Sequence, residues 1–439
     1  MAGKSPRMVV MELLFKVSEN AFSNLALDGI LSKEEYTTQD RKFISRLFYG
    51  VIERQVTLDY IISLYSSIPL HKLDKTVLII LRMGLYQILY MESVPDNAAV
   101  NESVNLVKLS RKKSAASFVN AVLRNFIRND RKIDYPDDTI KRISVMYSCP
   151  EELTEKLVVQ LGADNATAFL KASLEPHKLY LRVNNTKITT EALLKCFAEQ
   201  GISAKKNKFD NCCVESESIG SVENNDMFKE GMYHIQDLSS QLCCKALSPC
   251  SNDVILDICA APGGKSFTIA EMTDDKAVIY SCELHKKRVD LIKHGAERLG
   301  LKSITPLQND AKVFNDNFPQ FDKILCDVPC SGYGVIRSKP EIKYTALKDV
   351  SRLPEIQYDI LSTAAKYLRI GGELVYSTCT VIKEENDFVI DKFLENNPNF
   401  VGVPFLEEYG KPFGEYKALI LAENMDCEGF FISKIKRVK

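Results

Sequence analysis

Two cysteines of this sequence stand where a nucleophile could act. Cys330 lies in the run Asp327-Val-Pro-Cys-Ser-Gly332, and Cys379 lies in Tyr376-Ser-Thr-Cys-Thr380. Each run follows a short apolar segment that is typical of a buried strand. A single cysteine at a strand end is usually a small packing residue, but two of them, in Pro-Cys and Thr-Cys contexts with Asp327 close by, favour chemistry. The spacing does not say which of the two thiols attacks.

A loop rich in small residues precedes both cysteines. It runs Asp257-Ile-Cys-Ala-Ala-Pro-Gly-Gly-Lys265, after an apolar segment and before a helical one. Gly263 and Gly264 permit backbone conformations that are closed to other residues, and they let the chain approach a ligand closely. The run has neither the G-x-G-x-x-G spacing of dinucleotide sites nor the P-loop pattern, which disfavours pyrophosphate and triphosphate ligands.

Two acidic residues suggest that this loop serves a nucleoside. Glu283 ends the next strand-like segment, where a carboxylate can accept hydrogen bonds from ribose hydroxyls. Asp310 follows the third such segment and could accept a bond from an adenine amino group. Each residue also has a plainer interpretation, because Glu283 could pair with Lys286 or Lys287, and Asn-Asp is common in turns. Ribose and adenine acids without a phosphate cradle favour S-adenosylmethionine over NAD.

These two groups of residues together suit methyl transfer to carbon 5 of cytosine. That carbon is too unreactive for direct methylation, but a thiolate that adds to carbon 6 makes it enamine-like and able to attack a sulfonium methyl group. The proton on carbon 5 must then be removed and the thiolate expelled. An acid that hydrogen-bonds the ring nitrogen stabilises the charge that develops. Cys330, Cys379 and Asp327 meet these needs.

The elements that must position these residues lie in the C-terminal half of the chain. Five short apolar runs predict strands, with helical patterns between most of them, at residues 254–257, 277–282, 303–307, 323–326 and 373–376. This alternation predicts an α/β, Rossmann-like methyltransferase domain over residues 236–439, with a mostly parallel sheet. Ligands bind such sheets outside the carboxyl ends of the strands. Each motif described above falls at one of those ends.

The rest of the 439-residue chain predicts two further domains. Apolar residues recur at helical spacing up to about residue 130, with short junctions between the helices, which predicts an all-α bundle over residues 1–135. Residues 145–235 combine helical segments with a strand at 178–183 and predict a small α+β domain. The chain is therefore expected to be multidomain.

Composition narrows the classes of partner. The formal net charge of −1 gives no attraction of the whole molecule to nucleic acid, so a basic surface must come from local clusters. One such cluster is formed by Arg111, Lys112 and Lys113. A run of this kind is most often a solvated face, but beside an RNA-modifying domain it favours contact with phosphate.

Membrane insertion, export and metal binding are not expected. No apolar run is long enough to span a bilayer, and Glu12 and Lys16 interrupt the apolar N-terminal stretch that might otherwise resemble a signal peptide. The 13 cysteines are odd in number and contain no Cys-x-x-Cys pair, so they predict neither a disulfide framework nor a zinc site. A cytoplasmic protein is the expectation.

Three runs resemble the signature motifs of the RNA cytosine-C5 methyltransferase superfamily, namely residues 257–265, 327–332 and 376–380. Within it the chain is most similar to the bacterial 16S rRNA methyltransferases of the Sun/Fmu type, also called RsmB. The N-terminal bundle resembles the RNA-binding antitermination factor NusB, and residues 236–241 resemble the start of the family's catalytic domain. The resemblance covers nearly the whole chain.

The resemblance implies a role for each residue of the site. Cys379 would be the nucleophile at carbon 6 of cytosine, and Cys330 would assist removal of the proton or release of the adduct. Asp327 would contact both the cofactor and the cytosine ring, and Lys265 would also serve catalysis. The residues expected to bind S-adenosylmethionine are Cys259, Ala260, Ala261, Pro262, Gly263, Gly264, Lys265, Glu283, Asp310 and Asp327.

The resemblance also implies the substrate. It would be 16S rRNA, naked or in an early small-subunit particle, with cytosine 967 as the family's usual target. A monomer without metal is expected. Two alternatives remain open: a methyltransferase of tRNA or another RNA, and a NusB-like RNA-binding or assembly protein with an inactive methyltransferase domain. Intact Cys330, Cys379, Asp327 and Lys265 argue against the second alternative.

A few positions depart from the family's usual pattern or add to it. Thr380 stands where serine is common, and Glu283 stands where many relatives have aspartate, although its longer arm still reaches a ribose hydroxyl. Cys427-Glu428-Gly-Phe-Phe431 resembles a C-terminal Asp-Gly-Phe-Phe, with Glu428 in place of the aspartate. The sequence offers no physical account of that change. Arg337 follows the Pro-Cys run in a stretch that resembles an RNA-contacting loop, which predicts a contact with phosphate.

Overall fold

The computed structural model describes residues 5–18, 23–31 and 36–439. Parts of the predicted N-terminal bundle, at residues 1–4, 19–22 and 32–35, lie outside the described residues. The chain forms two compact units, residues 1–174 and residues 175–439. Within the described ranges, no helix combines the length and the apolar character that a membrane span requires.

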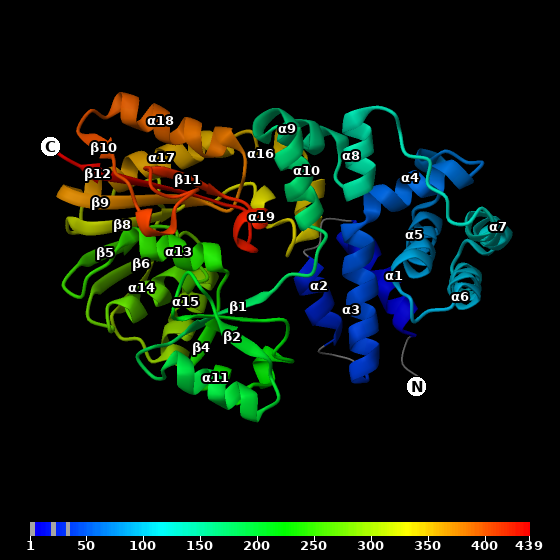
Figure 1. Cartoon of the computed structure of the whole chain (residues 1–439), viewed down its shortest axis with the longest axis horizontal. Coiled ribbons are helices and arrows are strands. Elements are labelled where there is room, and N and C mark those ends of the chain that lie inside the picture. The colour runs from blue at the N-terminus through cyan, green and yellow to red at the C-terminus, as the bar shows by residue number, and fades with distance from the viewer. Residues whose placement is uncertain (1–4, 19–22, 32–35) are drawn as a thin grey trace. The chain divides into compact units, whose positions relative to one another are not determined.

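The first unit is built from α-helices, as predicted (Figure 1). Their bounds are α1 (Pro6–Val17), α2 (Ser23–Leu31), α3 (Thr38–Glu53), α4 (Gln55–Tyr65), α5 (Lys75–Tyr90), α6 (Asp96–Leu109), α7 (Ala116–Arg128), α8 (Thr139–Tyr147), α9 (Glu151–Leu161) and α10 (Ala163–Ala172). Two 3-10 turns, η1 (Leu70–Lys72) and η2 (Lys113–Ala115), join α4 to α5 and α6 to α7. Residues 129–138 form the loop between α7 and α8.

Side-chain caps and a central apolar helix organise this unit. Ser5, Thr37, Asp74 and Asp138 each accept a hydrogen bond from a backbone N–H of the first helical turn that follows, which satisfies donors that the helix itself leaves free. Helix α5 is buried along most of its length and contacts α1, α3, α4, α6 and α7. Helix α8 packs on α4 and α9, so this unit extends beyond the boundary expected at residue 135.

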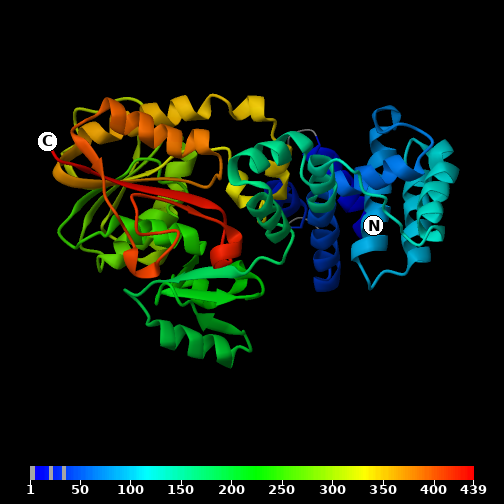
Figure 2. The same ribbon diagram turned by 45° about the horizontal axis from the view of Figure 1, so that its top comes forward.

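The second unit begins with a small antiparallel sheet in the order β2-β3-β1-β4. Its strands are β1 (Leu179–Val183), β2 (Ala204–Lys206), β3 (Cys213–Ser216) and β4 (Tyr233–Ile235). Helix α11 (Thr190–Glu199) covers one face (Figure 2), and Leu193 and Phe197 of that helix share a core with Leu181 and Val214 of the sheet. The short elements η3 (Val222–Asn224) and α12 (Asp226–Lys229) precede β4. This arrangement confirms the predicted α+β character.

The large sheet of the second unit has the order β10-β12-β9-β8-β5-β6-β7, with β11 paired to β12. Strands β5 to β9 are mutually parallel, and β10, β11 and β12 add antiparallel pairs at one side. All five predicted strands are present, but the three antiparallel strands were not predicted. The bounds are β5 (Val254–Asp257), β6 (Val278–Glu283), β7 (Ile304–Gln308), β8 (Phe321–Asp327), β9 (Leu368–Thr378), β10 (Phe400–Gly402), β11 (Lys417–Ile420) and β12 (Phe430–Arg437).

Helices cover both faces of the large sheet (Figure 1). Helices α13 (Leu238–Leu247), α14 (Gly264–Met272) and α15 (Lys286–Leu299) lie on one face, and α17 (Leu353–Tyr367) and α18 (Asp387–Asn396) lie on the other. This three-layer order brings the carboxyl ends of β5 to β9 to one edge of the sheet. The remaining short elements are η4 (Tyr333–Val335), η5 (Pro340–Tyr344), α16 (Leu347–Val350), η6 (Lys383–Glu385), η7 (Glu407–Tyr409) and α19 (Ala422–Met425).

A buried charge cluster joins the small sheet to the large one. The guanidinium of Arg182, on β1, lies 3.0 Å from a carboxylate oxygen of Asp210 and 3.1 Å from one of Glu271, on α14. His234 of β4 lies 3.4 Å from the other oxygen of Glu271. The side chain of Glu271 is fully buried, and the guanidinium of Arg182 supplies the countercharge that a buried carboxylate needs. The two sheets are therefore held in one unit by charges as well as by apolar contacts.

Candidate active site

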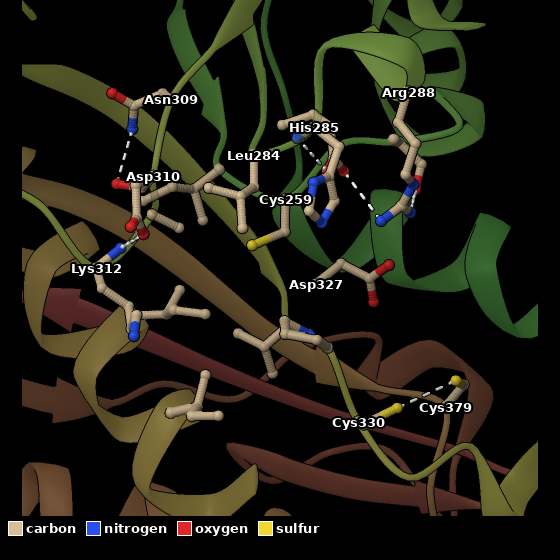
Figure 3. A pocket seen from close by; sticks show the side chains of 18 residues that line it. Cys259, Leu284, His285, Arg288, Asn309, Asp310, Lys312, Asp327, Cys330 and Cys379 are labelled. Atoms are coloured by element: carbon tan, nitrogen blue, oxygen red, sulfur yellow. Dashed lines mark hydrogen bonds and ion pairs between the residues drawn. The ribbon is translucent and has the colours of Figure 1, made fainter.

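A pocket of about 360 Å³ opens at the edge of the large sheet where β5 to β8 end (Figure 3). Its walls come from the loop after β5, the end of β6, the turn after β7 and the run that follows β8. Among the lining residues are Cys259, Ala261, Glu283, Leu284, His285, Arg288, Asn309, Asp310, Asp327, Cys330 and Cys379. Residues predicted at five different strand ends, those of β5 to β9, therefore share one cavity, as expected for a doubly wound sheet.

The loop after β5 folds tightly against the end of β6. The N–H of Ala260 donates to the carbonyl of Cys282 at 2.8 Å, and α14 starts at Gly264. Gly263 has a φ of +113°, and a Cβ built there would lie 2.4 Å from the ring of Phe267. Only glycine fits this position. The loop thus presents backbone rather than bulky side chains to the pocket, which suits close contact with a ligand.

Glu283 is the last residue of β6, and both of its carboxylate oxygens have a polar partner. One accepts a hydrogen bond from the N–H of His285 at 3.0 Å, and the other lies 3.2 Å from the guanidinium of Arg288. Arg288 also donates to the carbonyl of Ala261 at 2.9 Å. The partner of Glu283 is therefore Arg288, not the Lys286 or Lys287 considered from the sequence. The arginine ties the acid at the end of β6 to the loop after β5.

Sequence reasoning missed Arg288 as a residue of this site. The available signal was a cation placed in the first turn of the helix that follows Glu283. Nothing local separates it from its basic neighbours, because Lys286, Lys287 and Arg288 are consecutive. The fold selects the one that faces the pocket.

Asp310 takes part in a turn and also lines the pocket. One of its carboxylate oxygens accepts a hydrogen bond from the N–H of Lys312 at 3.0 Å, which is ordinary turn chemistry. The residue also lines the pocket, beside Asn309 and across from Cys259 (Figure 3). Its contact with an adenine amino group stays a prediction.

Asp327 connects the pocket to the two cysteines. Its carboxylate accepts a hydrogen bond from Nζ of Lys265 at 2.6 Å and another from the hydroxyl of Ser377 at 2.7 Å. Burial alone would lower the pKa of Lys265, but Asp327 and the neighbouring thiols raise it above its ordinary value. Lys265 is thus a permanent cation, which also lies 5.2 Å from the ring centroid of Phe430. This cation holds Asp327 in place as a carboxylate.

The sulfur atoms of Cys330 and Cys379 point toward one another across 3.1 Å (Figure 3). The hydrogen bond from Cys330 holds the pKa of the Cys379 thiol below its ordinary value, and the cations of Lys265 and Lys339 act in the same direction. The same hydrogen bond, together with burial, raises the pKa of the Cys330 thiol well above its ordinary value, and the anions Glu385 and Asp327 add to that effect. Of the two thiols, that of Cys379 is therefore the one that ionises more readily.

The residues predicted to contact RNA lie in different settings. Arg111, Lys112 and Lys113 lie between α6 and α7 in the first unit, where all three are exposed and Lys112 pairs with Asp74 at 2.9 Å. The side chain of Arg337 is only 6% exposed. Its guanidinium binds Asp426 and the carbonyls of residues 175 and 176, so its position does not support the predicted phosphate contact.

The fold has three α/β layers, and its pocket is lined by Glu283 and Asp310 and by two thiols that face one another. This combination is the one expected of a methyltransferase. Residues 244–436 match the model of the 16S rRNA methyltransferase RsmB/F family. Residues 4–128 match that of the NusB family, and residues 149–223 match the ferredoxin-like domain of RsmF/B-like methyltransferases. No group of three or more His, Cys, Asp or Glu that could hold a metal ion occurs in the described part of the chain.

Similar proteins place the chain more narrowly. A probable ribosomal RNA small subunit methyltransferase B of Bacillus subtilis is 39% identical and covers 99% of both chains. Its counterpart in Synechocystis is 30% identical over 95% of this chain and 96% of its own. The solved structure of the protein PH0851 shares the fold, with a TM-score of 0.83, 22% identity and coverage of 99% of both chains. The chain belongs to the ribosomal RNA small subunit methyltransferase B family.

This result agrees with the multidomain organisation expected from the sequence, which is a NusB-like helical domain, a small α+β domain and a methyltransferase domain. The match to the ferredoxin-like domain begins at residue 149, whereas the first compact unit extends to Leu174. The two measures therefore assign α9 and α10 to different sides of the boundary. The division at residues 135, 145 and 235 stays a prediction.

Proposed function

We propose that this protein transfers the methyl group of S-adenosylmethionine to carbon 5 of a cytosine in 16S rRNA. The observation that carries the proposal is the 3.1 Å approach of the Cys330 and Cys379 sulfurs in a wall of the nucleoside pocket. Membership of the ribosomal RNA small subunit methyltransferase B family supports the choice of RNA. Within 16S rRNA, cytosine 967 is the candidate target.

The described residues fit S-adenosylmethionine. Glu283 and Asp310 line the 360 Å³ pocket at the ends of the adjacent strands β6 and β7, as acceptors for ribose hydroxyls and an adenine amino group. Gly263 takes a turn that no residue with a Cβ could take beside Phe267, and the loop 259–265 can approach the ligand with its backbone. When bound, the cofactor supplies an electrophilic methyl group. The residues of the chain bind it, orient the cytosine and move the proton.

The reaction begins with the thiolate of Cys379. Its sulfur forms a bond to carbon 6 of cytosine, and the electrons of the double bond between carbons 5 and 6 move into the ring. Carbon 5 would then take the methyl group as the bond between that group and the sulfonium sulfur breaks, which would leave a neutral thioether. Removal of the proton from carbon 5 restores the double bond as the bond between sulfur and carbon 6 breaks, which returns Cys379 as a thiolate.

Two neighbours of Cys379 assist these steps. Asp327, held by Lys265 and Ser377, hydrogen-bonds the cytosine ring while charge develops on it. Cys330 assists removal of the proton or release of the adduct, because its sulfur lies against that of Cys379. The target cytosine must leave its stack to reach these groups, as bases do in other enzymes that act on them.

Binding of the RNA involves both compact units in this proposal. The exposed cations Arg111, Lys112 and Lys113 supply phosphate contacts that do not depend on sequence. Choice of one cytosine must come from contacts near the pocket, since phosphate contacts position a nucleic acid without reading it.

One experiment tests the substrate and the reaction together. The protein is incubated with S-adenosylmethionine carrying a labelled methyl group and with total RNA from a strain that lacks the enzyme, and the labelled base is mapped. Label at carbon 5 of one cytosine of 16S rRNA is the expected result. Label confined to tRNA would overturn the choice of rRNA, and RNA without labelled cytosine would overturn the enzymatic activity. Running naked 16S rRNA beside isolated small-subunit particles identifies the preferred form of substrate.

A further inference from the structure

A buried carboxylate lies directly behind the two cysteines. Glu385 ends the turn η6 after β9 and is 2% exposed. One of its oxygens accepts hydrogen bonds from the N–H of Ser331 and from Nε2 of Gln357, both at 2.9 Å. The other accepts from the hydroxyl of Ser331 at 2.5 Å. Ser331 directly follows Cys330, so the hydrogen bonds of Glu385 hold the loop that contains this thiol.

The same network reaches the loop that carries Cys379. The hydroxyl of Ser331 lies 2.8 Å from that of Thr380, which directly follows Cys379. Asn386, next to Glu385, donates to the carbonyl of Thr380 at 3.0 Å and accepts from the hydroxyl of Thr378 at 2.5 Å. Thr378 and Thr380 flank Cys379, so the pair Glu385-Asn386 holds both cysteine loops from one side.

The carboxylate of Glu385 is held by neutral donors. They are the amide of Gln357 and the N–H and hydroxyl of Ser331, and no ion pair to Glu385 is found among the described residues. An anion buried in this way is costly unless hydrogen bonds offset the loss of water. It retains its electrostatic effect on nearby groups, because a cation does not neutralise it. The ionisable groups it acts on include the thiol of Cys330 and the phenol of Tyr376.

We propose that Glu385 is a positioning residue for methyl transfer, whose carboxylate braces the two cysteine loops and keeps Cys330 a neutral thiol that donates to the sulfur of Cys379. The inference rests on the proposed function, in which Cys379 attacks. It supplies what the cysteines alone lack, which is a reason for two adjacent thiols of the same chemical type to behave differently.

The charges that face the two thiols agree with this assignment. Lys265 and Lys339 favour a thiolate at Cys379. Glu385 and Asp327 oppose one at Cys330. Of the two anions, Asp327 also opposes ionisation of Cys379, so it does not distinguish the thiols, whereas Glu385 is hydrogen-bonded to the residue that follows Cys330 and raises the pKa of that thiol. Removing the charge of Glu385 should therefore lower the pKa of Cys330.

The test measures which cysteine reacts. The full chain, without RNA or cofactor, is treated with iodoacetamide between pH 6 and pH 9, and mass spectrometry gives the alkylation rate of each cysteine. In the unaltered chain Cys379 should react well before Cys330. In Glu385→Gln the ratio of the two rates should fall about tenfold, since one unit of pKa changes the thiolate fraction tenfold below the pKa. Glu395→Gln, the same change at an exposed position of α18, should leave the ratio unaltered.

Two further comparisons separate a positioning role from a merely structural one. Cys282 and Cys326 are fully buried in the sheet, so faster alkylation of these two in Glu385→Gln would report general loosening and overturn the proposal. If Glu385→Gln does not fold, the hydroxyl of Thr380 offers a second route. Thr380→Val should lower the ratio, and Thr380→Ser should restore it, because only the hydroxyl takes part in the network.

The outcomes for this inference and for the proposed function can be told apart. A chain that methylates no RNA but shows the predicted ratios of alkylation rates would refute the proposed function and support the role of Glu385. If the chain methylates 16S rRNA and the ratio of alkylation rates is unchanged in both Glu385→Gln and Thr380→Val, only the proposed role of Glu385 is refuted. In an active chain, Glu385→Gln should also shift the pH profile of kcat while KM for RNA stays within about twofold, since phosphate contacts that set RNA affinity are untouched.

Discussion

Glu428 lies 3.2 Å from Nε2 of His177, and Asp237 lies 3.7 Å from the same nitrogen. These residues come from the segment before β12, the segment before β1 and the N-cap of α13. Burial would lower the pKa of His177, but Asp237 and Glu428 together raise it to about 9. The glutamate that replaces the family's aspartate thus has a physical role, because its longer arm reaches a cation that joins three distant segments.

Stability should depend on pH through His177. Its pKa is raised from 6.5 to about 9 on folding, so its stabilising contribution is full below pH 6.5 and is lost as pH rises through 9. The contribution is on the order of 2 kcal/mol at pH 6, allowing for partial exposure. His177→Ala should therefore lower the thermal midpoint at pH 6 and match the unaltered chain more closely at pH 9.5. His294→Ala, at an exposed histidine of α15, should show no such convergence.

The length of the Glu428 side chain should matter only when His177 is present. Glu428→Asp shortens the arm by one methylene and should cost about 1 kcal/mol at pH 7, as expected for a weakened ion pair that is largely buried. In the His177→Ala background the same change should cost much less. Urea unfolding of the four proteins gives the coupling energy. Equal costs in the two backgrounds would mean that the pair does not interact.

The two cysteines should fail in different ways when each is replaced. Cys379→Ala should abolish methyl transfer, because no thiolate is left to add to carbon 6. Cys330→Ala should instead accumulate a covalent complex with RNA that survives denaturing electrophoresis, because addition proceeds and release does not. Trapping of RNA by Cys379→Ala, and not by Cys330→Ala, would reverse the two roles. Cys250→Ala, at an exposed cysteine, serves as the control and should behave like the unaltered chain.

Arg288 should contribute to cofactor affinity although it lies outside the sequence motifs that predicted the site. Arg288→Met removes the 3.2 Å contact to Glu283 and the 2.9 Å hydrogen bond to Ala261. Loss of two such contacts corresponds to about a tenfold rise in the Kd for S-adenosylmethionine. Titration calorimetry measures it directly. Lys286→Met is the matched control, because Lys286 faces Asp290 at 3.9 Å instead of the pocket, and it should leave the Kd within twofold.

The sequence by itself determined the local elements and the position of each motif. The period of the apolar residues predicted the helices of the first unit and the parallel strands β5 to β9, because burial on one or both faces imposes that period directly. Once the strands are placed, a parallel sheet brings their carboxyl ends to one edge. The assembly of Cys259, Glu283, Asp310, Asp327 and the two cysteines around one pocket follows from that rule.

Only the tertiary structure decided which groups pair across long stretches of chain. His177 with Glu428, Arg337 with Asp426, and Ser331 with Glu385 leave no periodic signal, because each pair is formed by residues that are remote in sequence and near in space. The antiparallel strands β10 to β12 were missed for a related reason: β10 and β11 are short, and β12 pairs with β9 and β10, which are remote from it in sequence. The sequence therefore identified the reactive residues. The packing of distant segments decided which of the two thiols ionises more readily.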